Sequence, residues 1–134
     1  MDSELADNLR KYFEKEGVEF AYLFGSRAVG REHPDSDYDL AVRWPEPFDA
    51  IDGFNVAVRM EGELAHLCDG EVDLVFLNMA SPLLTFEVIR HGKILYSHDE
   101  ERRIRWEMRA RAAYEDYLHI QSFFIRAMKE ELAS

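Results

Sequence analysis

Three short apolar segments constrain the fold of this chain more than any other feature. They occupy residues 18–24 (VEFAYLF), 37–44 (DYDLAVRW) and 71–78 (EVDLVFLN). Apolar and aromatic runs of this length are typical of β-strands, and they are far shorter than the roughly 20 residues that cross a membrane. Turn-forming residues follow the first two runs, with Gly25 after the first and Pro45 after the second. We therefore expect three strands.

The segments between these strands have helical periodicity. Apolar residues recur every three or four positions in residues 4–16 and 53–67, and Ser3 is the expected N-cap of the first helix. Ser81 and Pro82 predict the start of a third helix, because serine is a favoured N-cap and proline suits the first helical position.

After the third helix the sequence predicts a short edge strand over residues 93–97 and then a long helical region. Asp99 is a suitable N-cap, and helical character continues to about residue 132 with at most one break. Strands separated by helices indicate an α+β fold, in which a mixed β-sheet is covered by helices. We expect one structural domain, with residues 1–98 as the core and residues 99–134 as a C-terminal helical extension packed on it.

The charge of the chain is strongly and unevenly negative. The net charge is −11, and almost all of it belongs to residues 1–98. Such a domain repels a phosphate backbone, so nucleic-acid binding is disfavoured, whereas a divalent cation would be well tolerated. The single cysteine, Cys68, excludes an internal disulfide and a cysteine zinc cage, and the N-terminus has no signal-peptide core. These features predict a cytoplasmic protein without a membrane segment.

Three carboxylates are crowded into the beginning of the second predicted strand. Asp35, Asp37 and Asp39 fall within five residues, and Asp73 lies early in the third strand. Because side chains alternate along a strand, Asp37 and Asp39 share one face. If Asp73 joins them from a neighbouring strand, the oxygen ligands suit Mg²⁺, which completes its coordination with water and substrate phosphates. The other interpretation of Asp37 and Asp39 is a solvated acidic turn, and Asp35 is expected to be an ordinary loop acid.

The residues after the first strand suit an anion. Gly25 allows a sharp turn and close approach of the backbone to a ligand. Ser26 is expected at the N-terminus of a short helix over residues 26–30, where free N–H groups and a hydroxyl bind phosphate. Arg27 adds a guanidinium that can contact phosphate oxygens, although a surface salt bridge explains it equally well. A Gly-Ser anchor followed by carboxylates predicts a nucleoside triphosphate site.

This constellation resembles a known family. Gly25-Ser26, ten residues, Asp37-Tyr38-Asp39 and a later Asp73 are similar to the motif of the nucleotidyltransferase superfamily that includes DNA polymerase beta. The small size of the chain and its sequence motif GSRA…SDYDLAV resemble those of the minimal nucleotidyltransferases (MNT). The tail SPLLTFEVIRHGKILYSHDEERR resembles that of MNT antitoxins paired with HEPN-domain toxins. Val29 departs from the pattern, because relatives often carry Arg or Lys there.

The resemblance implies a polymerase beta-like fold and transfer of AMP from ATP to a tyrosine hydroxyl of a cognate HEPN RNase toxin, which silences the toxin. It implies that Asp37 and Asp39 bind two Mg²⁺ ions, and that Asp73 completes the site and helps to deprotonate the acceptor. The implied partner is the toxin, in a hetero-oligomer. Two alternatives remain: an antitoxin that inhibits by binding alone, and a small-molecule nucleotidyltransferase.

Arginine and aromatic side chains alternate along residues 102–117. This pattern is typical of either a solvated helix face or a partner-binding surface. A HEPN RNase motif is not expected in the tail, because the nearest arginine before His119 is Arg111, with seven residues between them.

Overall fold

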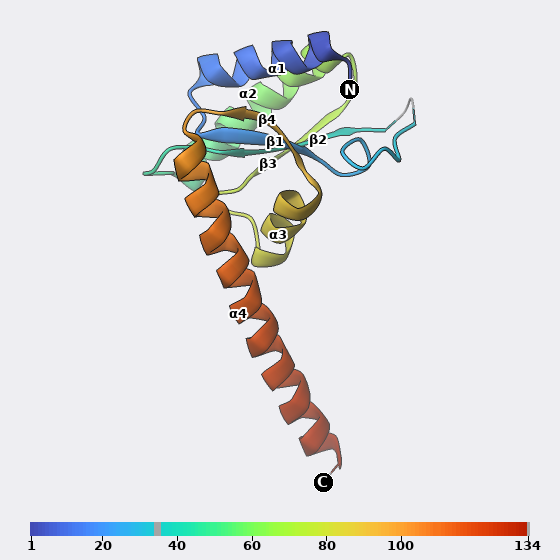
Figure 1. Ribbon diagram of the computed structural model, residues 1–134, viewed down its shortest axis with the longest axis vertical. Coiled ribbons are helices and arrows are strands. Elements are labelled where there is room, and N and C mark those ends of the chain that lie inside the picture. Colours follow the sequence, from blue (N-terminus) through green and yellow to red (C-terminus); the bar gives the residue numbers. More distant parts are fainter. Residues whose placement is uncertain (34–35, 134) are drawn as a thin grey trace.

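A computed structural model describes residues 1–33 and 36–133, which form a four-stranded sheet with helices on both faces (Figure 1). Helices α1 and α2 lie on one face of the sheet, and α3 and the beginning of α4 lie on the other. The elements in chain order are α1 (Ser3–Glu16), β1 (Phe20–Phe24), β2 (Tyr38–Arg43), α2 (Ala50–Cys68), β3 (Val72–Phe76), α3 (Pro82–His91), β4 (Lys93–Ser97) and α4 (Glu100–Ala133).

The sheet is mixed, as the sequence predicted. Its strand order is β3-β2-β1-β4, with β1 antiparallel to both of its neighbours and β2 parallel to β3. The strand at residues 93–97 is an edge strand, which confirms that prediction. The antiparallel pairing of β1 with β2 brings the end of β1 beside the beginning of β2, and this is where the acidic residues lie.

Alternation along the strands separates two apolar clusters. Ala21 and Leu23 of β1 face α1 and α2, whereas Phe20 and Tyr22 face α3 and α4. The first cluster is the larger and includes the fully buried Leu9, Phe13, Met60 and Leu64 from the two covering helices. One face of the sheet is therefore covered by the larger cluster, and the other is covered where α3 and α4 reach it.

Two helix starts differ from the sequence-based expectation. The N-cap of α1 is Asp2 rather than Ser3: the Asp2 carboxylate accepts a hydrogen bond from the Glu4 backbone N–H at 3.1 Å, and Ser3 is already helical. Helix α2 begins at Ala50 rather than residue 53, because the Asp49 carboxylate accepts from the Ile51 N–H at 2.8 Å. In both cases the nearest aspartate satisfies the free N–H groups of the first turn.

The starts of α3 and α4 follow the sequence. The Ser81 hydroxyl accepts from the Leu84 N–H at 3.2 Å, with Pro82 in the first turn. The Asp99 carboxylate accepts from the Arg102 N–H, also at 3.2 Å. Helix α4 then runs without a break to Ala133.

Only the first part of α4 packs on the core. Trp106 lies against Phe20, with ring centroids 4.8 Å apart, and Tyr114 stacks on Phe86 of α3 at 4.0 Å. Residues 115–133 are exposed, and this part of the helix projects away from the body (Figure 1). The expectation that the whole extension packs on the core was therefore wrong for its second half. Among residues 1–33 and 36–133, no helix is both long enough and apolar enough to cross a bilayer.

Candidate active site

The sheet brings the predicted carboxylates to one place. Asp39 of β2 pairs in register with Asp73 of β3, and on its other side with Phe24 at the end of β1. Neighbouring strands lie about 4.8 Å apart, so the Asp39 and Asp73 side chains stand side by side. Asp37 directly precedes β2.

All three carboxylates share the sheet face that α3 and α4 partly cover. Tyr38 and Leu40, which alternate with Asp37 and Asp39, pack into the cluster beneath α1 and α2. Leu74, which follows Asp73, packs into the same cluster. Asp37, Asp39 and Asp73 therefore point to the opposite face of the sheet. This confirms the alternation expected for Asp37 and Asp39.

Asp39 is in the least favourable electrostatic environment of the three. Its burial raises the pKa of the Asp39 carboxyl, and the negative charges of Asp73 and Asp37 raise it further. Asp37 and Asp73 are exposed. Asp73 is exposed because it lies on β3, which is an edge strand of the sheet.

Gly25 lies directly against this acidic group. It has a φ of +75°, and a Cβ at this position would lie 2.2 Å from Oδ2 of Asp39. No other residue type fits, because a side chain would both strain the backbone and displace the carboxylate. The sequence predicted close approach of Gly25 to a ligand, which stays a prediction; within the chain, the group that approaches Gly25 closely is the Asp39 carboxylate.

The segment after Gly25 forms turns rather than the expected short helix. The Ala28 N–H donates to the Gly25 carbonyl at 3.1 Å, and the Arg31 N–H donates to the Ser26 carbonyl at 2.9 Å. Gly30, with a φ of +72°, bends the chain before a helix can extend. Ser26 is half-buried beside the acidic group but is not at a helix N-terminus.

Arg27 holds the loop that carries the carboxylates. Its guanidinium donates to the Ser36 carbonyl through Nε at 3.1 Å and Nη2 at 2.8 Å. The same guanidinium stacks over the Tyr38 ring, 3.9 Å from the centroid. These contacts fix the chain just before Asp37. Asp35 lies outside the described residues.

The donor set suits magnesium. The three carboxylates offer only oxygen ligands, and no ion pair or hydrogen bond from the rest of the described chain reaches them. Within residues 1–33 and 36–133, no group of three Asp, Glu, His or Cys side chains is arranged so that it could hold a metal ion by itself. Mg²⁺ does not need such a group, because it takes one or two carboxylates and fills its shell with water and phosphate oxygens.

A groove of about 720 Å³ opens beside Gly25. Its walls come from the end of β1, the turn after it and one side of α3. The lining residues are Phe24, Gly25, Val29, Arg31, Leu84, Glu87 and His91. The sequence analysis missed Arg31, Glu87 and His91, because nothing local in the sequence indicates that the turn and α3 face a common space.

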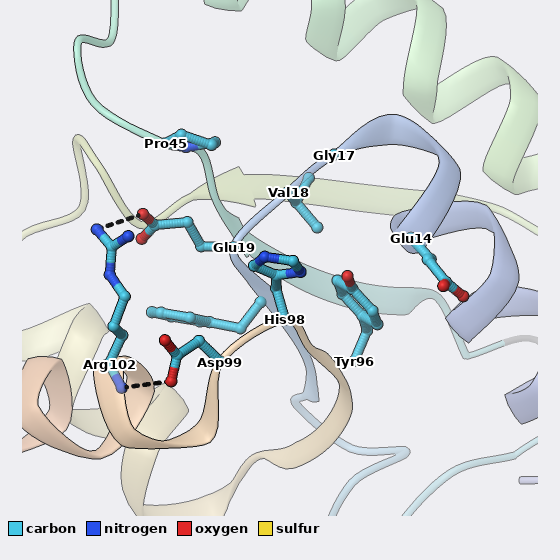
Figure 2. Close-up of a pocket in the computed structure, with 10 residues that line it drawn as sticks. Glu14, Gly17, Val18, Glu19, Pro45, Tyr96, His98, Asp99 and Arg102 are labelled. Carbon is cyan, nitrogen blue, oxygen red and sulfur yellow. Dashed lines mark hydrogen bonds and ion pairs between the residues drawn. The ribbon is translucent and has the colours of Figure 1, made fainter.

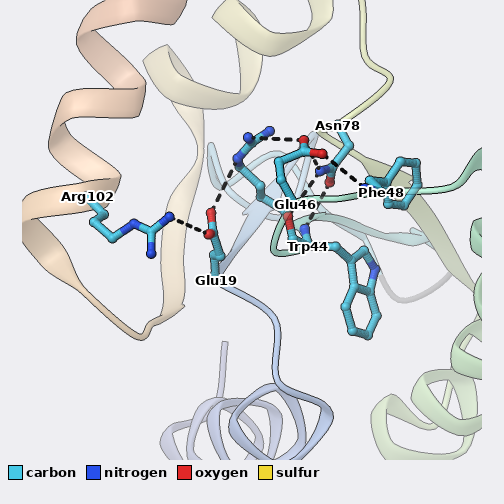
Figure 3. A network of polar contacts seen from close by, with 7 residues as sticks. Glu19, Trp44, Glu46, Phe48, Asn78 and Arg102 are labelled. Carbon is cyan, nitrogen blue, oxygen red and sulfur yellow. Dashed lines mark hydrogen bonds and ion pairs between the residues drawn. The ribbon is translucent and has the colours of Figure 1, made fainter.

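A second hollow, of about 440 Å³, lies at the other end of β1 (Figure 2). Tyr96, His98 and Asp99 line it, together with Glu19 and Arg102. Its strongest charges already have partners within the chain. The Glu19 carboxylate pairs with Arg102 at 3.1 Å and with a second arginine, Arg43, at 3.4 Å (Figure 3).

The same polar network closes the ends of β2 and β3. The Trp44 N–H donates to Oδ1 of Asn78 at 2.9 Å, and Nδ2 of Asn78 donates to the Trp44 carbonyl at 3.0 Å (Figure 3). Glu46 accepts from Asn78 at 3.2 Å. These contacts join strand ends, and the polar groups of this network are paired with one another. The end of β1 that lies beside Asp37, Asp39 and Asp73 is therefore the better candidate for an active site.

A mixed sheet with a Gly-Ser turn after one strand, and aspartates at the beginning of the next two, defines the class of nucleotidyltransferases. The chain belongs to the family described as polymerase beta, nucleotidyltransferase, whose model matches residues 7–101. This confirms the family and the fold expected from the sequence.

More specific similarities lie within that family. The protein adenylyltransferase MntA of Shewanella oneidensis is 35% identical over 97 residues, which are 72% of this chain and 63% of that protein. The chain thus matches less than two thirds of the length of this relative.

Two solved structures are similar over nearly the whole chain. One is a toxin–antitoxin structure with AMP-PNP, which has a TM-score of 0.71, 27% identity and coverage of 96% of this chain and 98% of the other. The other describes a tri-AMPylated Shewanella oneidensis HEPN toxin in complex with MNT antitoxin, with a TM-score of 0.68, 25% identity and full coverage of both chains.

Proposed function

We propose that this chain is an antitoxin that works as a Mg²⁺-dependent protein adenylyltransferase. It transfers AMP from ATP to a tyrosine hydroxyl of a cognate HEPN-domain toxin and thereby neutralises the toxin. The observation that carries the proposal is the group of Asp37, Asp39 and Asp73, which repel one another on an open part of the sheet beside Gly25. The similarity to MntA and to a structure with AMP-PNP supports ATP as the substrate.

The residues of the site have separate roles in this reaction. Asp37, Asp39 and Asp73 would hold the magnesium ions, which would supply charge neutralisation for the triphosphate. The turn at Gly25 and Ser26 brings backbone groups close to the nucleotide. The tyrosine oxygen attacks the α-phosphorus, the bond from that phosphorus to the β-phosphate oxygen breaks, and pyrophosphate leaves. Asp73, which is exposed and open to an incoming protein, accepts the tyrosine proton.

The test is transfer of label from α-labelled ATP to the HEPN-domain partner in the presence of Mg²⁺. We expect label on a tyrosine of the partner with the unmodified chain and none with the double variant Asp37→Asn/Asp39→Asn. Asp52→Asn is the matched control, because Asp52 is an exposed acid on α2, which covers the other face of the sheet. Equal labelling by the double variant would refute the proposed site.

A second candidate, inhibition by binding alone, is favoured by the projecting half of α4. Its exposed apolar side chains are Tyr117, Leu118, Ile120, Phe123, Phe124, Ile125, Met128 and Leu132. Most of them lie on the same side of α4 as Trp106 and Tyr114 of its packed half. Their sequence separations from these two residues are close to multiples of 3.6, the number of residues in one helical turn. We propose that residues 99–134 bind the toxin through this side, in a hetero-oligomer.

Binding and catalysis are separable by experiment. Phe124→Ser with Met128→Ser is expected to weaken capture of the toxin, whereas Arg126→Ser, on the opposite side of the helix, is expected to leave it unchanged. If the double aspartate variant of the active site still captured and inhibited the toxin fully, binding alone would account for neutralisation. Modification of a small molecule such as an aminoglycoside would instead support the alternative of a small-molecule nucleotidyltransferase.

We place the protein in the cytoplasm, where ATP is available and its buried thiol at Cys68 stays reduced.

A further inference from the structure

The groove beside Gly25 adjoins the acidic group through Gly25, although Asp37, Asp39 and Asp73 do not line it. Gly25 lines the groove and also lies against Asp39, since a Cβ on Gly25 would be 2.2 Å from Oδ2 of that residue. The groove volume, about 720 Å³, falls within the range of roughly 300–1,000 Å³ that is usual for small-molecule sites. A triphosphate whose α-phosphorus lies at the carboxylates therefore has room to extend along the groove.

An anion in this groove needs cationic or N–H donor groups, because the carboxylates beside it repel phosphate. Arg27 is poorly placed to supply them, since its guanidinium already donates twice to the Ser36 carbonyl and stacks on Tyr38. Breaking those contacts would release the loop that positions Asp37. The groove must be served by other residues.

Arg31 and His91 are the donors that line the groove. The Arg31 backbone is fixed by its N–H bond to the Ser26 carbonyl at 2.9 Å, while its exposed guanidinium has no ion pair or hydrogen bond within the described part of the chain. His91 lines the groove at the end of α3, and within residues 1–33 and 36–133 its side chain has one long contact, 3.9 Å, with Glu87. An imidazole retains an N–H donor in either protonation state.

We propose that Arg31 and His91 bind the β- and γ-phosphates of the nucleotide, and so hold the departing pyrophosphate, whereas Arg27 acts only by positioning the loop. This inference rests on the proposed function, because it concerns the same nucleotide. Glu87, the only carboxylate among the groove-lining residues, opposes the phosphates and limits the affinity.

The test measures binding rather than transfer, by calorimetric titration of the full chain with Mg²⁺ and either ATP or AMP. Arg31→Gln is expected to weaken ATP binding about ten- to a hundredfold, the usual effect of losing hydrogen bonds to a charged group, and to leave AMP binding unchanged. His91→Ala is expected to act in the same direction with a smaller effect, and Glu87→Gln is expected to tighten ATP binding.

Two control variants sharpen the result. Arg90→Gln changes an exposed arginine of α3 that does not line the groove, and it should bind ATP like the unmodified chain. Arg27→Gln should lower the melting temperature and affect ATP and AMP binding equally, because it releases the loop rather than a phosphate contact.

The outcomes separate the inference from the proposed function. Unchanged ATP binding by Arg31→Gln, or an equal loss of ATP and AMP binding, would overturn the inference while the unmodified chain still transfers AMP. A rise only in the KM for the acceptor protein would also overturn it, by assigning the groove to the acceptor. If the unmodified chain neither binds ATP nor transfers AMP, the proposed function itself fails.

Discussion

Two groups of charged side chains occupy the same face of the sheet, and they are built in opposite ways. At the base of α4, the buried Arg103 donates to Glu100 and Glu107, each at 2.6 Å, and the Tyr22 hydroxyl of β1 donates to Glu107. Every charge there has a partner within the chain. At the end of β1, the carboxylates have only one another, and they repel.

The difference distinguishes a group that stabilises the fold from one that we propose binds a ligand. The paired group joins α4 to the sheet, and burial together with Glu107 raises the pKa of Tyr22, so its hydroxyl stays protonated and keeps donating. The unpaired carboxylates lower the stability of the fold, and in the proposed function a cation from outside the described chain compensates them. Substitutions in the two groups should therefore have opposite consequences.

The largest change in stability is expected at the paired group. Arg103→Ala leaves Glu107 half-buried without its cation, and breaking such a pair costs about 2–4 kcal/mol in the free energy of unfolding. Urea denaturation measures it. Arg105→Ala is the matched control: Arg105 is an exposed arginine of the same helix paired with Glu101, and its removal should cost less than about 0.5 kcal/mol. Equal losses would mean that burial does not distinguish the two pairs.

Local sequence signals were sufficient for most of the fold. The alternation in β1 and β2, the Ser81-Pro82 start of α3 and the Asp99 cap of α4 all depend on neighbouring residues. The missed features depend on more distant ones. The turn after Gly25 replaces a helix because of the positive φ at Gly30, and the point where α4 leaves the body depends on its packing against Phe86 of α3.

The candidate site was predictable to a similar degree. The proximity of Asp37, Asp39 and Gly25 follows from strand alternation and a short connection. Arg27 illustrates what was missed, because its stacking on Tyr38 depends on how the intervening loop closes. That Arg31 and His91 line one groove depends on the packing of α3, which no sequence pattern records.

Magnesium should reverse the disadvantage of the unpaired group. At a concentration ten times its dissociation constant, a cation bound only by the folded state adds about 1.4 kcal/mol of stability. We expect Mg²⁺ to raise the melting temperature of the unmodified chain and of Arg105→Ala, but not that of Asp39→Asn. Equal stabilisation of all three would place magnesium elsewhere on this acidic protein.

The smallest expected effect concerns pH, and it isolates the repulsion itself. The pKa of the Asp39 carboxyl is raised above its ordinary value of 3.8, so the folded state binds this proton more tightly than the unfolded state does. Ionised Asp39 therefore destabilises the fold at neutral pH, and this penalty disappears as the pH falls through the raised pKa towards 3.8.

Without magnesium, Asp39→Asn should be more stable than the unmodified chain at pH 7, and its advantage should shrink on acidification. Urea denaturation at pH 7 and at about pH 4 measures this change. Asp52→Asn serves as the control, because it also removes one negative charge but lies on the other face of the sheet, away from Asp37 and Asp73. An advantage of Asp39→Asn that stayed constant with pH would mean that packing, rather than charge repulsion, sets the cost of this residue.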